Sequence, residues 1–166
     1  WKRRVGRGMW HPGETINTSI GQGDVLTTPL QLAVMTARMV NGGKKILPRL
    51  TEEVDVRDNG FIDIDEECLK LAMEGMYMVT NEPGGTAYGS GIREEGYRFA
   101  GKTGTSQVRR ITVRGMDQNK LPWKYRHHGV FVGYGPTASP QYCCAVFIEH
   151  GGGGSSAAAP VARDVM

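Results

Sequence analysis

Residues 100–106 read Ala100-Gly101-Lys102-Thr103-Gly104-Thr105-Ser106, and their conformation determines how the rest of the sequence is interpreted. This stretch satisfies two sequence patterns whose chemistries are incompatible. Counted from Gly96 to Thr103, it matches the P-loop, in which a glycine-rich loop holds phosphate and the lysine opens a helix. Alternatively, Lys102-Thr103-Gly104 matches an element of enzymes that form an acyl-serine. The flanking residues must decide between the two.

The flanks favour a strand. A P-loop needs a buried parallel strand before the glycines, yet residues 89–95 are rich in glycine and charge. Tyr97 and Phe99 alternate with Arg98 and Ala100, which is strand periodicity, and β-branched residues continue to Val113. The best remaining support for phosphate binding is the apolar run 144–149, which ends in an acid that an ATPase could use for magnesium. We therefore disfavour phosphate binding.

On a strand, the four residues Lys102 to Thr105 suit a ligand that carries a carboxylate. Lysine supplies a compact positive charge, and the hydroxyls of Thr103 and Thr105 can donate hydrogen bonds to carboxylate oxygens. Gly104 leaves room for a ligand backbone. Alone, such a tripeptide is a weak signal, so its neighbours matter.

Several further segments strengthen the signal from Lys102-Thr103-Gly104, because they occur in the same order as in a known protein family. They are Ile20-Gly21-Gln22-Gly23, Thr28-Pro29-Leu30-Gln31-Leu32-Ala33, Glu74-Gly75-Met76-Tyr77, Gly85-Thr86-Ala87, the strand segment 100–108, His128-Gly129-Val130-Phe131-Val132-Gly133 and the glycine run that begins at Gly151. Together they resemble class B penicillin-binding proteins, in particular cell-elongation transpeptidases of the penicillin-binding protein 2 type. The resemblance extends over almost the whole chain.

The resemblance implies that residues 1–166 are the C-terminal portion of a single penicillin-binding transpeptidase domain. It implies an α/β fold of the α+β type, like that of serine β-lactamases, with an antiparallel sheet covered by helices on both faces. The implied reaction is peptidoglycan D,D-transpeptidation through an acyl-serine, with stem peptides as substrates, β-lactams as inhibitors and no cofactor.

The resemblance also assigns the site residues. Lys102 would place positive charge near the substrate carboxylate and a proton-moving serine, and Thr103 and Thr105 would hold that carboxylate beside Gly104. The Thr105 backbone N–H would supply half of an oxyanion hole.

Two motifs of that family do not occur in this sequence. None of the serines is followed by lysine three residues on or by asparagine two residues on, so neither Ser-x-x-Lys nor Ser-x-Asn is present. The chain starts at Trp1 without methionine and stops at Met166 in a helical pattern. We therefore expect a fragment that is inactive alone. The alternative is a non-catalytic structural or binding fragment that associates with the missing N-terminal part of the domain, or dimerises through an uncovered sheet edge.

Composition excludes several classes. With 166 residues, 39% of them hydrophobic, the chain is globular rather than disordered. Its net charge of +3 arises from 20 basic and 17 acidic residues, too even a mixture for a nucleic-acid partner. No signal peptide or run of about 18 apolar residues occurs. The resemblance implies a periplasmic domain of an inner-membrane-anchored protein.

We predict no metal site. Cys143 and Cys144 are neighbours on a strand, so their side chains point to opposite faces. The histidines lack ligand spacing, and we assign them structural or solvent-facing roles. The basic segment 109–128 is interpreted as a solvated hairpin tip in preference to a flap that contacts acidic peptidoglycan.

The patterning predicts two long helices. Thr28, Pro29 and Gln31 form an N-cap signature for a helix to Val40, which is apolar nearly all round and should lie in the core. A second helix is predicted to start after Asp65, and Gly75 inside this helix predicts close packing against a neighbouring element.

Strands are predicted near residues 97–113, 130–134 and 142–149, antiparallel because no helix connects them. The last two are apolar at successive positions, so helices should cover both faces. A terminal helix opens near Ser156, with Pro160 in its first turn.

Overall fold

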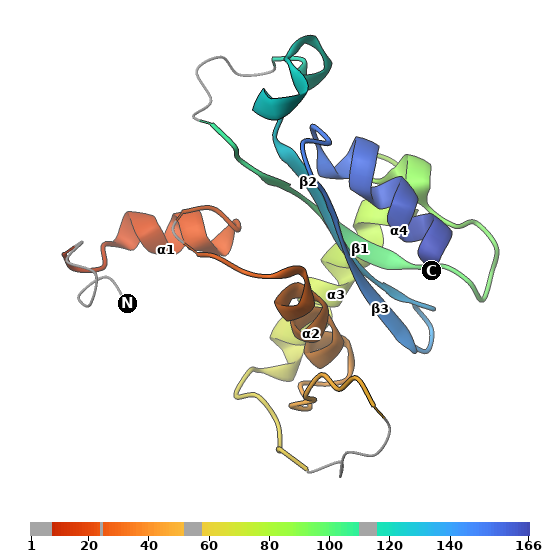
Figure 1. Cartoon of the computed structure of the whole chain (residues 1–166). Coiled ribbons are helices and arrows are strands. Elements are labelled where there is room, and N and C mark those ends of the chain that lie inside the picture. Colours follow the sequence, from red (N-terminus) through yellow and green to blue (C-terminus); the bar gives the residue numbers. More distant parts are fainter. Residues whose placement is uncertain (1–7, 24, 52–57, 110–115) are drawn as a thin grey trace.

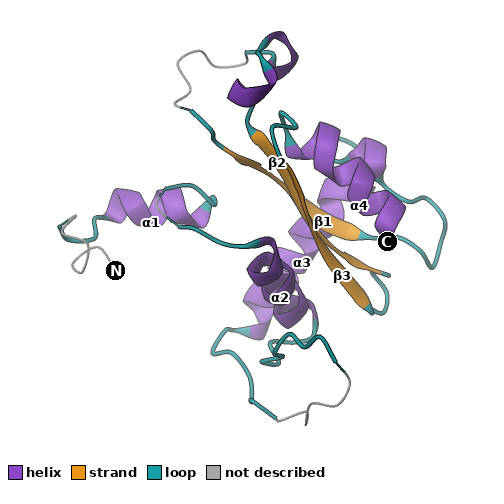
Figure 2. Cartoon of the chain, in the orientation of Figure 1, coloured by secondary structure: helices purple, strands orange, loops and turns teal. Residues whose placement is uncertain are grey.

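The computed structural model describes residues 8–23, 25–51, 58–109 and 116–166 (Figure 1). Its main elements are α1 (Pro12–Ser19), α2 (Pro29–Val40), α3 (Glu66–Asn81), β1 (Ala100–Ser106), β2 (His128–Gly135), β3 (Tyr142–Ile148), the π-helical turn η4 (Gly154–Ala158) and α4 (Ala159–Val165). Short 3-10 turns are η1 (Tyr88–Ser90), η2 (Gln118–Lys120) and η3 (Trp123–Tyr125). Figure 2 shows the strands in orange and the helices around them in purple.

The strands form one antiparallel sheet in the order β1-β2-β3. Lys102 lies opposite Val132, and Thr105 lies opposite Gly129. The predicted antiparallel pairing is confirmed. The first strand is shorter than predicted, because residues 97–99 and 107–109 lie outside β1. The predicted continuation through residues 110–113 falls outside the described residues.

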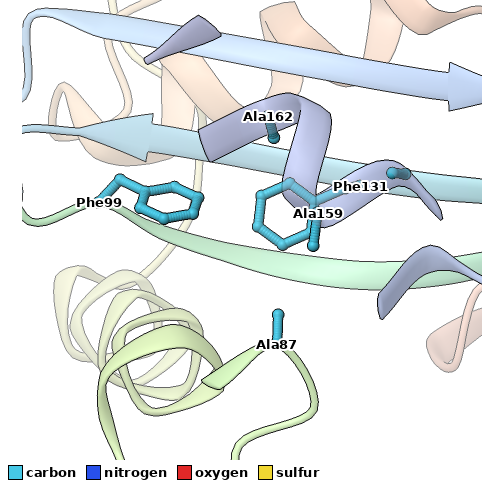
Figure 3. Packing of buried hydrophobic residues seen from close by; sticks show 6 residues of the cluster. Ala87, Phe99, Phe131, Ala159 and Ala162 are labelled. Atoms are coloured by element: carbon cyan, nitrogen blue, oxygen red, sulfur yellow. The ribbon is translucent and has the colours of Figure 1, made fainter. Parts of the chain in front are cut away.

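Helices cover both faces of this sheet, as predicted. On one face, Phe99 and Phe131 pack with a 5.9 Å centroid distance against the alanines of the η4–α4 segment and against Ala87 (Figure 3). On the other face, Met76 of α3 packs with Tyr134, and partly buried residues of α2 join them. Small alanines on η4 and α4 let this segment approach the sheet closely.

The predicted cap of α2 and the predicted start of α3 after Asp65 are confirmed. The Thr28 hydroxyl accepts from the Gln31 N–H at 3.2 Å, and Gln31 Oε1 accepts from the Thr28 N–H at 2.8 Å. The Asp65 carboxylate accepts from the Glu67 N–H at 2.7 Å and opens α3. Polar caps are local signals, which is why both boundaries could be predicted.

The predicted burial of α2 is wrong. Of its residues only Thr36 is buried, and the Leu30 and Met35 side chains are 59% and 50% exposed. The described neighbours cover the side of α2 that faces the sheet, and its outer side lines an apolar groove. This groove, of about 740 Å³, is lined by residues that include Leu30, Val34, Met35, Ile62, Ile64 and Ala72.

The close packing predicted at Gly75 is also wrong. A Cβ atom built at Gly75 would meet no atom within 4 Å, so this glycine lies on the open side of α3. In contrast, α1 was not predicted, although Pro12 is its first residue and the Glu14 carboxylate accepts from the His11 N–H at 2.7 Å. None of its residues is buried, and it extends away from the sheet (Figure 1).

The glycine run before the last helix forms a tight connection between β3 and η4. Helical structure starts at Gly154, two residues before Ser156, and Pro160 lies in the first turn of α4. Among the described residues, no helix has both the length and the apolar character required to cross a membrane.

Candidate active site

The candidate site lies on β1, an edge strand of the sheet formed by the described residues. Lys102 is exposed, and its ammonium donates to the Thr103 carbonyl oxygen at 2.9 Å. Its partner across the ladder, Val132, packs with the α2–α3 side of the molecule. The lysine therefore presents an accessible positive charge from the middle of a fixed strand.

The strand placement excludes the P-loop geometry. A phosphate-binding lysine opens a helix, whereas Lys102 lies within an antiparallel ladder whose next residues, Thr103 to Ser106, continue the strand. The first of the two incompatible patterns is therefore accidental.

Thr103 and Thr105 lie on the same side of β1, because side chains two residues apart point to one face. The Thr103 hydroxyl lies 2.9 Å from the hydroxyl of Thr86, which belongs to the turn after α3. Thr105 is exposed, opposite Gly129. The two threonine side chains therefore stand on the same face of an accessible strand.

Gly104 lies between them in the strand. Its Cβ position is uncrowded, and the backbone of η4 packs against its main-chain atoms. A Cβ atom built at Gly104 would meet only Val130, at 3.4 Å or more, which is ordinary contact. From the other side, a Cβ built at Gly154 would lie 2.5 Å from the Gly104 carbonyl oxygen and 2.8 Å from its nitrogen. The η4 turn therefore supports β1 by backbone contact, which only glycine at position 154 permits.

Thr86 is a part of this site that the sequence patterns did not predict. It is 17 residues from Thr103 in the chain, and the turn after α3 brings the two hydroxyls together. The available signal was Gly85-Thr86-Ala87, where a hydroxyl stands between two small residues.

The histidines beside the site make structural contacts. His127 Nδ1 accepts from the Val108 N–H at 3.1 Å, and His128 Nδ1 accepts from the His150 N–H at 2.8 Å. Burial lowers the pKa of His127, and the positive charge of Arg109 and the neighbouring His128 lower it further. The structural roles predicted for these three histidines agree with these contacts.

The cysteines are free thiols. Burial raises the pKa of both Cys143 and Cys144, so neither is activated as a nucleophile. In the ranges that the structure describes, no three His, Cys, Asp or Glu side chains come together as metal ligands.

Comparison with known proteins identifies the family. The family model described as "Penicillin binding protein transpeptidase domain" matches residues 5–166. The peptidoglycan D,D-transpeptidase MrdA of Acinetobacter baumannii is 39% identical over 177 residues, covering 97% of this chain and 25% of that protein. MrdA of Salmonella typhimurium is 32% identical over 178 residues, covering 100% of this chain and 28% of that protein.

Solved structures give the same result. Pseudomonas aeruginosa PBP2 in complex with WCK 5153 superposes with a TM-score of 0.74 at 35% identity, covering 100% of this chain and 36% of that one. Helicobacter pylori PBP2, in its complex with MreC, superposes with a TM-score of 0.78 at 30% identity, covering 98% and 28%. The chain therefore spans about a quarter to a third of the length of these relatives.

The antiparallel sheet with helices on both faces agrees with the fold of these solved structures. Because the family model and the relatives match nearly the whole chain, it belongs to the transpeptidase-domain family of penicillin-binding proteins and, within that family, to the PBP2 (MrdA) type.

Proposed function

We propose that this chain is the substrate-binding portion of a peptidoglycan D,D-transpeptidase, and that residues 1–166 belong to one transpeptidase domain. The observation that carries the proposal is the exposed edge strand, on which Lys102, Thr103 and Thr105 stand around an uncrowded Gly104. A carboxylate-bearing extended peptide suits such a strand, because charge and hydroxyl donors lie beside an open backbone.

In the proposed reaction, a serine from a segment outside this sequence attacks the carbonyl carbon of the penultimate D-alanine of a stem peptide. The peptide C–N bond breaks, and terminal D-alanine leaves as the amine after receiving a proton. An amine of a neighbouring stem then attacks the acyl-serine and restores the hydroxyl. β-Lactams acylate the same serine through opening of their ring amide.

The residues of β1 have separate roles in this scheme. Lys102 attracts the terminal carboxylate and places its positive charge near the serine that transfers protons. The hydroxyls of Thr103 and Thr105 bind that carboxylate. The Thr105 N–H and the N–H of the nucleophilic serine stabilise the oxyanion. We further propose a periplasmic location with an inner-membrane anchor, in keeping with a substrate in the cell wall.

The test compares this chain with the full-length protein in a labelling experiment with fluorescent penicillin. Loss of the nucleophile costs on the order of 10⁶ in turnover. We expect a covalent adduct on the full-length protein and none on this chain alone. Intact-mass detection of an acylated serine or lysine in this chain would refute the assignment of the nucleophile to another segment.

A second candidate is a non-catalytic structural or binding fragment that associates with the missing N-terminal part of the domain. The exposed apolar side of α2, with Leu30 and Met35, favours association with another polypeptide surface. The two candidates differ in the residues encoded before Trp1. A Ser-x-x-Lys motif followed by Ser-x-Asn there supports the transpeptidase, whereas a start codon directly before this segment favours the non-catalytic fragment.

A further inference from the structure

We propose that Thr86 is a positioning residue for Thr103: its hydroxyl donates to Thr103 Oγ1 and thereby directs the Thr103 proton to the ligand carboxylate. The inference rests on the proposed function of β1. The two oxygens lie 2.9 Å apart, and geometry alone permits either to be the donor. Thr86 is exposed and Thr103 is half-buried, so a ligand at β1 can reach this pair.

The turn that carries Thr86 is fixed on both sides. A Cβ atom built at Gly85 would overlap the backbone carbonyls of Met78 and Val79, so the chain passes tightly over the end of α3. The Ala87 N–H donates to the Val79 carbonyl oxygen at 3.0 Å. The Ala87 side chain is only 3% exposed and points into the Phe99–Phe131 cluster (Figure 3). Thr86 thus lies between two closely packed residues.

The direction of the hydrogen bond follows from counting protons. A threonine hydroxyl has one proton to donate, and an ionised carboxylate can only accept. If Thr103 donated to Thr86, its oxygen would turn lone pairs toward the bound carboxylate. With Thr86 as the donor, the Thr103 proton points to the carboxylate and all three oxygens are satisfied. Bound ligand therefore selects the direction from Thr86 through Thr103 to the carboxylate.

The experiment uses the full-length protein and measures the second-order rate constant of acylation by a β-lactam that carries a carboxylate. Thr86→Val removes the hydroxyl and keeps the shape, whereas Thr86→Ser keeps the hydroxyl. Because one neutral hydrogen bond is involved, we expect Thr86→Val to lower the rate constant roughly 2- to 10-fold. Thr86→Ser should retain the wild-type value. Thr27→Val, at another exposed threonine, is the matched control.

Two comparisons separate positioning from a structural effect. In a Thr103→Val background, Thr86→Val should cause no further loss, because the hydroxyl it orients is gone. With a methyl ester of the same β-lactam, the loss from Thr86→Val should shrink toward zero. Thermal unfolding should be the same for Thr86→Val and Thr27→Val.

The outcomes distinguish this inference from the proposed function. If Thr103→Val lowers acylation and Thr86→Val does not, the positioning role is refuted and the substrate strand stands. Equal losses in Thr86→Val and Thr86→Ser would assign the effect to shape and also refute it. If Thr103→Val itself has no effect, the proposed role of Thr103 fails.

Discussion

Lys102 is the residue whose charge matters most for the proposed chemistry. Lys102→Met keeps the length of the side chain and removes the ammonium. In the full-length protein we expect the rate of β-lactam acylation to fall on the order of 10²-fold, the usual cost of one electrostatic group at a reacting centre. Because the side chain is exposed, thermal unfolding should change little.

The matched control for this charge is Lys70→Met on α3. Lys70 is exposed and pairs with Glu66 at 2.8 Å, so its loss tests a cation remote from β1. Stopped-flow acylation should be unchanged in this variant. Wild-type rates in Lys102→Met would contradict the role assigned to the ammonium.

Substitution of two glycines by alanine should have opposite effects on the free energy of unfolding. A Cβ atom at Gly101 would overlap the Phe131 ring, so Gly101→Ala should lower the free energy of unfolding by about 1–3 kcal/mol. At Gly75 a Cβ meets nothing, and Gly75→Ala inside α3 should raise that free energy by about 0.5–1 kcal/mol. Chemical denaturation of the full-length variants measures both. A stabilising effect of Gly101→Ala would show that the β1–β2 contact is looser than described.

Among the elements, the connection between β1 and β2 depends on His127 as an acceptor. Its Nδ1 accepts from the Val108 N–H, and its pKa is lowered chiefly by burial, with contributions from Arg109 and His128. In the unfolded chain a histidine titrates at about 6.5. As the pH falls below that value, the unfolded chain takes up a proton that the folded chain resists, so stability must decrease.

As the pH falls from about 6.5 toward the lower pKa of His127 in the folded chain, we therefore expect the free energy of unfolding to decrease. Above about pH 6.5 this histidine causes no further pH dependence of the free energy of unfolding. His127→Gln should flatten that dependence, whereas His11→Gln, at the cap of α1, should leave it intact. Urea titrations at a series of pH values provide the measurement. An unaltered pH dependence in His127→Gln would contradict this mechanism.

The elements also show which features the sequence could predict. Boundaries of α2 and α3 followed from Thr28 and Asp65, since a cap acts on residues two or three positions away. Antiparallel pairing followed from short connections, and the position of Lys102 on a strand followed from its flanks. These are local properties of the chain.

Non-local features could not be predicted in this way. The exposure of Leu30 depends on which elements stand opposite α2, and an apolar helix pattern contains no such information. The Thr86–Thr103 contact depends on a turn folding back against β1. The site strand was therefore predictable, whereas the residue that orients one of its hydroxyls required the structure.

The chain as described exposes apolar surface and strand edges that favour association. Leu30 and Met35 are at least half exposed on α2, and the described sheet ends at β1 and β3. We expect this chain alone to sediment as dimers or larger species at high concentration, because apolar surface and unpaired strand edges favour pairing. The double substitution Leu30→Gln/Met35→Gln should weaken that association.

The same double substitution tests the origin of this exposure. The chain spans only 25% of its Acinetobacter baumannii relative, and we propose that other parts of the domain cover α2. In the full-length protein the double variant should therefore lower the unfolding temperature. A sharp monomer boundary for the unmodified chain at high concentration would contradict the association.

The contact between Gly154 and Gly104 links the ligand strand to the last helix. Its atoms belong to the main chain, so substitution of the exposed side chains of Lys102 or Thr105 leaves this contact in place. A substitution that shifts α4 would nevertheless move η4 and carry β1 with it. Under the proposed function, a substitution in α4 would then change the rate of β-lactam acylation without altering any group proposed to bind the ligand.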